Sequence, residues 1–83
     1  PSPAEIHAIA RQHVAELNAF YGEGKGLRVA RKHIGWYLSR LPQGKVFCQS
    51  LFGIDDAQLQ LDALDHYFTR LIDGELALTR LAA

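Results

Sequence analysis

The stretch GLRVARKHIGWYLSR, residues 26–40, contains the side chains of this sequence that are best suited to a chemical role. It holds four of the nine Lys and Arg residues, together with one His, one Trp and one Tyr, and no acidic residue. Lys and Arg neutralise phosphates and release counterions, and aromatic rings and guanidinium planes stack on unpaired bases. The stretch therefore indicates contact with a polyanion, most naturally a nucleic acid.

The charge of the chain is zero overall but is distributed unevenly. Residues 1–24 carry one Arg against three Glu, and residues 55–83 carry two Arg against six acidic residues. The middle of the chain, residues 25–54, carries no acid and six cations, namely Lys25, Arg28, Arg31, Lys32, Arg40 and Lys45. This uneven distribution indicates an anionic partner, and it is more informative about partners than the net charge of zero.

The ordinary explanation of a charged helix is a solvated face, and two features argue against it here. Arg28 and Lys32 lie one turn apart without an acidic residue to pair with them, and Trp36 falls on the same side. Because that side has no Asn or Gln to read adenine edges, it favours phosphate and shape recognition over sequence reading. Two alternatives remain open: a helix-turn-helix DNA-binding regulatory domain, and a protein-docking helical module without RNA affinity.

Other reactive residue types give weaker signals. Cys48 is the only cysteine, which excludes an internal disulfide and favours a reducing cytoplasm, and we expect it to be a buried structural thiol. The histidines lack zinc-ligand spacing, so no metal site is expected. His13 falls on an apolar helix stripe, where we expect a hydrogen-bonded histidine of the core or of a domain interface.

Four helices are needed to position these groups. The first is predicted over residues 2–21, with a capping box formed by Ser2 and Glu5. Gly22 should end it, and a turn over residues 22–26 follows. Its apolar stripe consists of Ile6, Ile9, Ala10, His13, Leu17, Phe20 and Tyr21.

The second helix is predicted over residues 25–40 and ends before Pro42. Its apolar stripe consists of Leu27, Ala30, Ile34, Tyr37, Leu38 and Leu41. Lys25, Arg28, Lys32 and Trp36 fall on the opposite side, with Arg31 at the edge of the stripe. His33 and Arg40 lie on the far shoulder of the helix.

A short helix over residues 45–52 and a fourth helix complete the fold. Asp55 should cap the fourth helix, with Gln58 at the reciprocal position, and Gly74 should follow its end. Its acidic residues, Asp62, Asp65 and Asp73, should be solvated and face away from an anionic partner. Residues 75–83 are expected to continue as a fraying helix or to cover a partner surface. The prediction is an all-α, small four-helix antiparallel bundle, one domain over residues 1–83, without a membrane span.

The segment FYGEGKGLRVARKHIGWYLSRLP resembles the C-terminal region of bacterial tRNA-dihydrouridine synthases, most closely those of the B type. The pattern of that family is similar to FYGE-x-x-G-x-R-x-ARKH-x-x-WY. The matching positions are Phe20, Tyr21, Gly22, Glu23, Gly26, Arg28, Ala30, Arg31, Lys32, His33, Trp36 and Tyr37. The likeness runs from about residue 9 to residue 42, and beyond residue 45 it is mainly helical patterning.

The resemblance implies an enzyme that reduces the C5–C6 double bond of uridines in tRNA. Such enzymes have an N-terminal (β/α)₈ barrel that carries FMN, reduced by NADPH, and a catalytic cysteine. A helical C-terminal domain helps to hold the tRNA, and the present chain is expected to be that domain, a non-catalytic piece of a longer cytoplasmic enzyme. It would bind no cofactor itself, and its partners would be tRNA and the barrel. The expected RNA-binding residues are Lys25, Arg28, Arg31, Lys32, His33, Trp36, Arg40 and Lys45.

Overall fold

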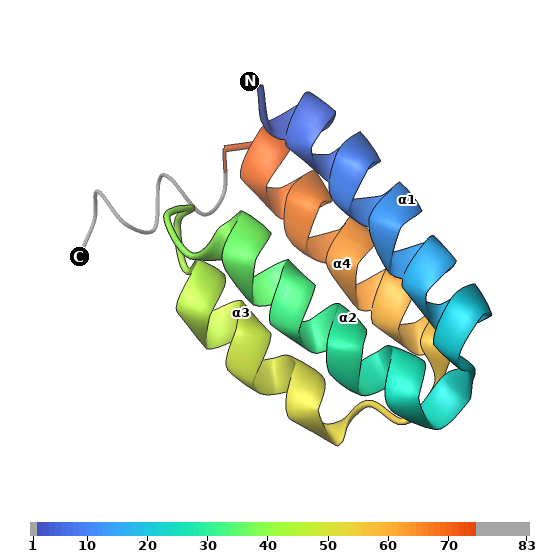
Figure 1. Cartoon of the computed structure of the whole chain (residues 1–83). Helices are drawn as coiled ribbons and strands as arrows, with labels where there is room; N and C mark the ends of the chain where they lie inside the picture. The colour runs from blue at the N-terminus through green and yellow to red at the C-terminus, as the bar shows by residue number, and fades with distance from the viewer. Residues whose placement is uncertain (1, 75–83) are drawn as a thin grey trace.

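The computed structural model describes residues 2–74, which form four α-helices and one short 3₁₀ turn. The elements are α1 (Pro3–Tyr21), α2 (Glu23–Leu38), α3 (Gly44–Ser50), η1 (Leu51–Gly53) and α4 (Ala57–Ile72). Consecutive helices run in opposite directions (Figure 1), and residues 2–74 contain no strand. The predicted all-α antiparallel bundle is confirmed, whereas the prediction for residues 75–83 lies outside the described residues. No helix of the described part is long and apolar enough to span a bilayer.

The first helix begins as the sequence predicts. The Ser2 side chain accepts a hydrogen bond from the Glu5 amide at 3.2 Å, and the Ser2 amide donates to the Glu5 carboxylate at 2.9 Å. The helix ends at Gly22, whose φ of +83° suits a residue without a Cβ. The predicted turn over residues 22–26 is wrong, because α2 begins immediately after Gly22 and one glycine reverses the chain.

The core lies between all four helices, and α2 buries the stripe that the sequence predicts. The buried apolar residues are Ala10, Val14, Leu27, Ala30, Ile34, Leu38, Leu51, Leu64, Tyr67 and Phe68. The predicted stripe of α1 is partly wrong, because Ile9 is 55% exposed and Phe20 is 81% exposed. Helix α4 packs on the side of α1 that carries His7, whose ring stacks on Phe68 with centroids 4.8 Å apart. The buried face of α1 is therefore rotated toward α4 and includes Val14 instead.

A buried polar bridge joins three helices near the α1–α2 turn. Gln60 of α4 is fully buried. Its side-chain oxygen accepts a hydrogen bond from Asn18 at 3.0 Å, and its side-chain nitrogen donates to the Leu27 carbonyl at 3.2 Å. A Cβ added at Gly26 would lie only 2.8 Å from the Asn18 Cα, so α1 and α2 are in close contact at this point. The bridge and the contact together fix α2 relative to α1 and α4.

Three predictions for α4 need correction or confirmation. The cap is Asp56 rather than Asp55, because the chain stays extended for one more residue, and Asp56 accepts a hydrogen bond from the Leu59 amide. Gln58 donates to Asp62 instead of completing a capping box. Gly74 follows the helix with a φ of +84°, as predicted.

Asp65 of α4 is not a solvated carboxylate, contrary to the prediction. Its Oδ1 lies 2.7 Å from His7 Nε2, and Arg11 Nε donates to the same oxygen at 3.1 Å. Both partners belong to α1, so the periodicity of α4 alone did not reveal the pairing. These contacts tie the middle of α4 to the first half of α1.

Candidate nucleic-acid interface

The outer face of α2 carries a row of exposed cations. Lys25, Arg28 and Lys32 are all exposed, and the seven residue-to-residue steps from the first to the last span about 10 Å along the helix. Both ion pairs found among the described side chains involve Asp65 on α4, and the α2 cations take part in neither. Their charges are therefore available to an external anion.

Aromatic rings lie beside three of the cations. Lys25 Nζ is 5.0 Å from the centre of the Tyr21 ring, and Lys32 Nζ is 5.7 Å from that of Trp36. The Arg31 guanidinium carbon is 5.4 Å from the centre of the Phe52 ring. A cation–π contact restrains a side chain without neutralising its charge. Trp36 is 63% exposed, so its ring also remains open to a stacking partner.

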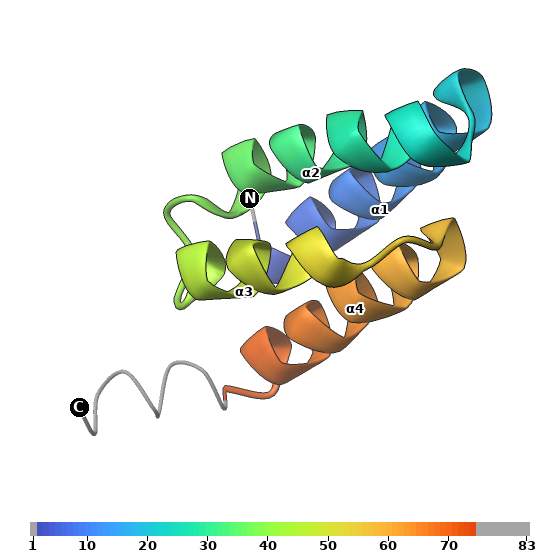
Figure 2. The same cartoon turned by 90° about the horizontal axis from the view of Figure 1, so that it is seen from below.

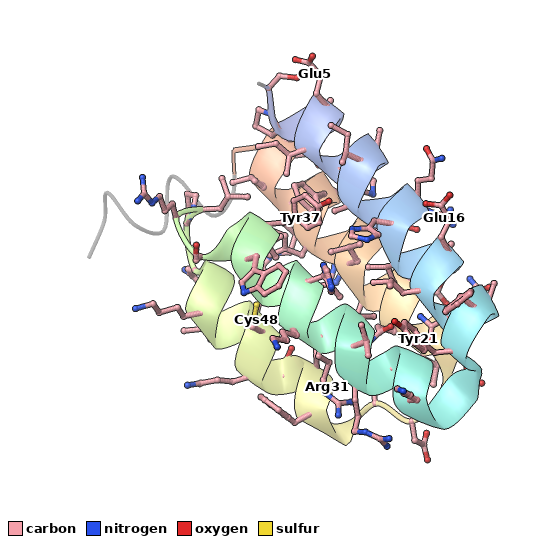
Figure 3. The ribbon with its side chains drawn as sticks, in the orientation of Figure 1. Glu5, Glu16, Tyr21, Arg31, Tyr37 and Cys48 are labelled. Carbon is pink, nitrogen blue, oxygen red and sulfur yellow. The ribbon has the colours of Figure 1, made fainter. Side chains whose placement is uncertain are left out.

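Arg31 is half-buried and points toward the side of α2 that faces α3 (Figure 3). There it borders a surface depression of about 370 Å³ that extends from α2 to α3 and η1. Sequence reasoning did not identify Phe52 as a site residue, although it is 71% exposed beside Arg31. Helical periodicity gives no signal for a residue of a 3₁₀ turn, and only the packing of α3 on α2 brings Phe52 to Arg31. The residues that line the depression are Arg28, Arg31, Lys32, Gly35, Cys48 and Phe52.

His33 belongs to a cluster of rings between α1 and α2. Its ring centroid lies 4.7 Å from that of His13 and 4.5 Å from that of Trp36. His13 Nδ1 in turn lies 3.1 Å from the Tyr37 hydroxyl, so the expected hydrogen-bonded histidine is confirmed. Burial lowers the pKa of His33, and the neighbouring His13 and Lys32 lower it further. His33 is therefore mainly neutral at pH 7, and it offers a polar ring rather than a positive charge.

Arg40 and Lys45 extend the cationic surface to the other end of α2. Both are exposed, Arg40 in the turn that follows α2 and Lys45 at the start of α3. Figure 1 shows that this turn lies at the C-terminal end of α2, whereas Lys25 lies near the N-terminal end, close to the α1–α2 turn. Exposed cations thus occur from the first turn of α2 to the start of α3.

Several of the described acidic residues lie on other helices than α2. Figure 2 shows α2 and α4 along opposite edges, and the exposed Asp62 belongs to α4. Glu5 and Glu16 project from α1 on the side away from α3 (Figure 3). Glu5, Glu16 and Asp62 thus belong to other helices than Lys25, Arg28 and Lys32, so part of the charge asymmetry of the sequence is kept as a separation of charge in space.

Comparison with known proteins adds independent information about the chain. A family model described as "Dihydrouridine synthase (Dus)" matches residues 1–73. The tRNA-dihydrouridine synthase B of Proteus vulgaris is 46% identical over 69 residues, which are 83% of this chain and 21% of that protein. The corresponding protein of Yersinia pestis is 43% identical over 72 residues, 86% of this chain and 22% of the relative. That of Vibrio vulnificus is 48% identical over 64 residues, 77% of this chain and 20% of the relative.

The chain belongs to the dihydrouridine synthase family. The family match reaches residue 73 and so includes all four helices, whereas the sequence motif indicated a clear likeness only as far as residue 42. The chain spans about a fifth of the length of the dihydrouridine synthases that it matches.

The family resemblance implies a catalytic cysteine, which raises the question of whether Cys48 has that role. The surroundings of Cys48 argue against it. The thiol is half-buried between α2 and α3, so the predicted buried thiol is only partly confirmed, and burial raises its pKa. It packs against the hydrophobic core. A thiol in this setting stays protonated at pH 7 and contributes mainly to packing.

FMN, which the family resemblance implies for the parent enzyme, does not fit the described part of this chain. The α2–η1 depression and a second one, between α3 and α4, are both open at the surface. Neither encloses a space in which a flavin ring would be shielded from water. We therefore assign no redox step to residues 2–74.

Proposed function

We propose that this chain is the tRNA-recognition domain of a flavin-dependent tRNA-dihydrouridine synthase, with the domain extending over residues 1–83. The parent enzyme reduces uridine to 5,6-dihydrouridine in tRNA, in the cytoplasm, and its N-terminal barrel binds FMN and NADPH. The chain itself is non-catalytic. The family match and the names of its relatives support the reaction. The exposed α2 cations, which form no ion pair with the described side chains, support the role of this part.

The contribution of such a domain is positional. An enzyme that modifies a base must take it out of the stacked RNA and hold it at the reactive group. A cationic surface that grips the folded tRNA elsewhere reduces the entropy lost on reaching that geometry. Lys25, Arg28, Lys32, Arg40 and Lys45 would contact phosphates, while Arg31, His33 and Trp36 would meet sugars or bases.

The two alternatives are weighed against the same surface. A sequence-reading DNA-binding domain is disfavoured because the cationic face of α2 lacks Asn and Gln. A protein-docking role is compatible with RNA binding, since large exposed apolar side chains also occur away from the α2 cations. Leu59 and Ile72, both on α4, are 55% and 50% exposed. These residues offer surface to the parent barrel and leave α2 free for RNA.

The test is tRNA binding by the chain, measured at several salt concentrations. If about four phosphates are contacted, the logarithm of affinity should fall with the logarithm of salt at a slope near −3. The double variant Arg28→Gln/Lys32→Gln should bind more weakly and should reduce the magnitude of the slope by about 1.5. Its far-UV circular dichroism should match that of the unsubstituted chain, because neither side chain makes an ion pair with the described residues.

A matched control changes the net charge equally at a different place. The double variant Gln12→Glu/Ala19→Glu lowers the charge by two at exposed positions of α1. The salt dependence of its tRNA affinity should have a slope close to that of the unsubstituted chain. Equal losses in both double variants would mean that only net charge matters, and parental binding by Arg28→Gln/Lys32→Gln would refute the assignment of α2.

A further inference from the structure

The depression between α2 and η1 combines several cations with one exposed aromatic ring. Three of its six lining residues are cations, and one is the exposed aromatic Phe52. No described carboxylate lines it. Its volume, about 370 Å³, lies near the lower end of the range for pockets that hold small organic ligands, about 300–1,000 Å³. A flat, anionic group of modest size would suit it.

Phe52 is poorly explained by stability alone. Its neighbour Leu51 is fully buried, whereas Phe52 is 71% exposed and has the Arg31 guanidinium over its ring. An exposed ring beside a guanidinium plane provides two surfaces on which a nucleobase can stack. Arg28 and Lys32 stand at the same depression and supply charges for the adjoining phosphate.

We infer that the α2–η1 depression is a subsite for one unpaired nucleotide of RNA, with its base on Phe52 or Arg31 and its phosphate against Arg28 and Lys32. The inference rests on the proposed function and specifies which part of the RNA this surface takes. Paired bases are stacked on their neighbours and are not free to enter. The subsite therefore distinguishes a loop or bulge from a duplex, which phosphate contacts alone would not do.

Gly35 offers a way to close the depression without damaging the fold. It lines the depression, and a Cβ added there would meet no atom within 4 Å. Gly35→Leu should place a side chain in the depression and should keep or raise the melting temperature, because leucine favours a helix more than glycine does. Gly24→Leu is the matched control, since Gly24 lies three turns earlier on α2, is equally open and is not part of the depression.

The affinities to measure are those for a short oligouridylate and for a fully paired RNA duplex with the same number of phosphates. Gly35→Leu and Phe52→Ala should each weaken oligouridylate binding about tenfold, as expected for the loss of one stacked base, and should leave duplex binding unchanged. Phe52→Tyr should bind as the parent does. Gly24→Leu should also retain parental affinity for both RNAs.

Cys48 supplies a second readout at the depression itself. It is the only cysteine of the chain and lines the depression, so its alkylation by N-ethylmaleimide reports local access. Saturating oligouridylate should slow this reaction in the unsubstituted chain several-fold, and a saturating RNA duplex should not.

The outcomes separate the two levels of the proposal. If Gly35→Leu and Phe52→Ala bind oligouridylate as tightly as the parent, the subsite is refuted, while salt-dependent tRNA binding still stands. An equal loss for oligouridylate and duplex refutes the subsite as well, because it would indicate only a general weakening. If the unsubstituted chain binds neither of the two test RNAs and no tRNA at any salt concentration, the proposed function is refuted and the subsite is refuted with it.

Discussion

Replacing Gly26 with alanine should destabilise the bundle, although helix propensity alone predicts the opposite. Gly26 lies in the first part of α2, where the helix crosses α1. In an open helix, alanine is more favourable than glycine by up to about 1 kcal/mol. Here the new Cβ would lie 2.8 Å from the Asn18 Cα and 3.2 Å from the Leu17 carbonyl oxygen. Both neighbours are backbone atoms and cannot rotate away, so one helix must move.

The magnitude follows from the competition between these effects. Overpacking a well-packed contact costs about 1–3 kcal/mol. The displacement also strains the hydrogen bond from Asn18 to the buried Gln60, which is worth about 1 kcal/mol. After the propensity gain is subtracted, we expect a net loss of about 1–2 kcal/mol in the free energy of unfolding. For a domain of this size that corresponds to a decrease of roughly 4–16 °C in melting temperature.

The assay is urea and thermal unfolding followed by far-UV circular dichroism, with Gly35→Ala as the control on the same helix. A Cβ at Gly35 meets no atom within 4 Å, so that variant should gain about 0.5–1 kcal/mol from propensity and the unfolded-state entropy. If Gly26→Ala proves as stable as Gly35→Ala, α1 and α2 are not locked at this contact and the reasoning is refuted.

Two further predictions concern titration. Burial, assisted by the neighbouring Cys48, raises the pKa of Tyr67 from 10.0 to about 12. The folded state therefore holds this proton longer than the unfolded state, so stability should be unaffected below pH 10 and should fall between pH 10 and 12 by about 2–3 kcal/mol. Tyr67→Phe should remove that dependence and, through loss of the hydrogen bond to the Pro42 carbonyl, cost about 1 kcal/mol at pH 7. The lowered pKa of His33 means that the folded state disfavours its protonation, so the free energy of unfolding should fall as the pH drops below 6.5. In the variant His13→Gln, NMR titration should show a higher His33 pKa, because one repelling neighbour is gone.

Much of the local structure could be read from the sequence, because its determinants are neighbours along the chain. The capping box at Ser2 depends on residues three apart, and the stop at Gly22 depends on one residue that tolerates a positive φ. The apolar stripe of α2 follows from its 3.6-residue period. The family assignment likewise came from one continuous motif, over residues 20–37.

Predictions failed where more than one helix decides the outcome. Periodicity gives the approximate apolar side of α1, but the presence of α4 beside His7 decides that Val14 is buried and Ile9 exposed. The pairing of Asp65 with His7 and Arg11 spans more than fifty positions of sequence. No local pattern contains this information, because it depends on which helices become neighbours.

The candidate RNA surface likewise has features that the sequence determines and features that depend on the packing of the helices. The sequence by itself determined that α2 is a helix with cations opposite its apolar stripe, since both follow from residue types at fixed angular intervals. Only the tertiary structure decided that those cations lack carboxylate partners among the described residues, and that Phe52 stands beside Arg31 at a shared depression. The physical reason is that a charge or a ring acquires its partners from whichever surfaces the packed helices bring within a few ångströms, and that packing is a property of the whole bundle.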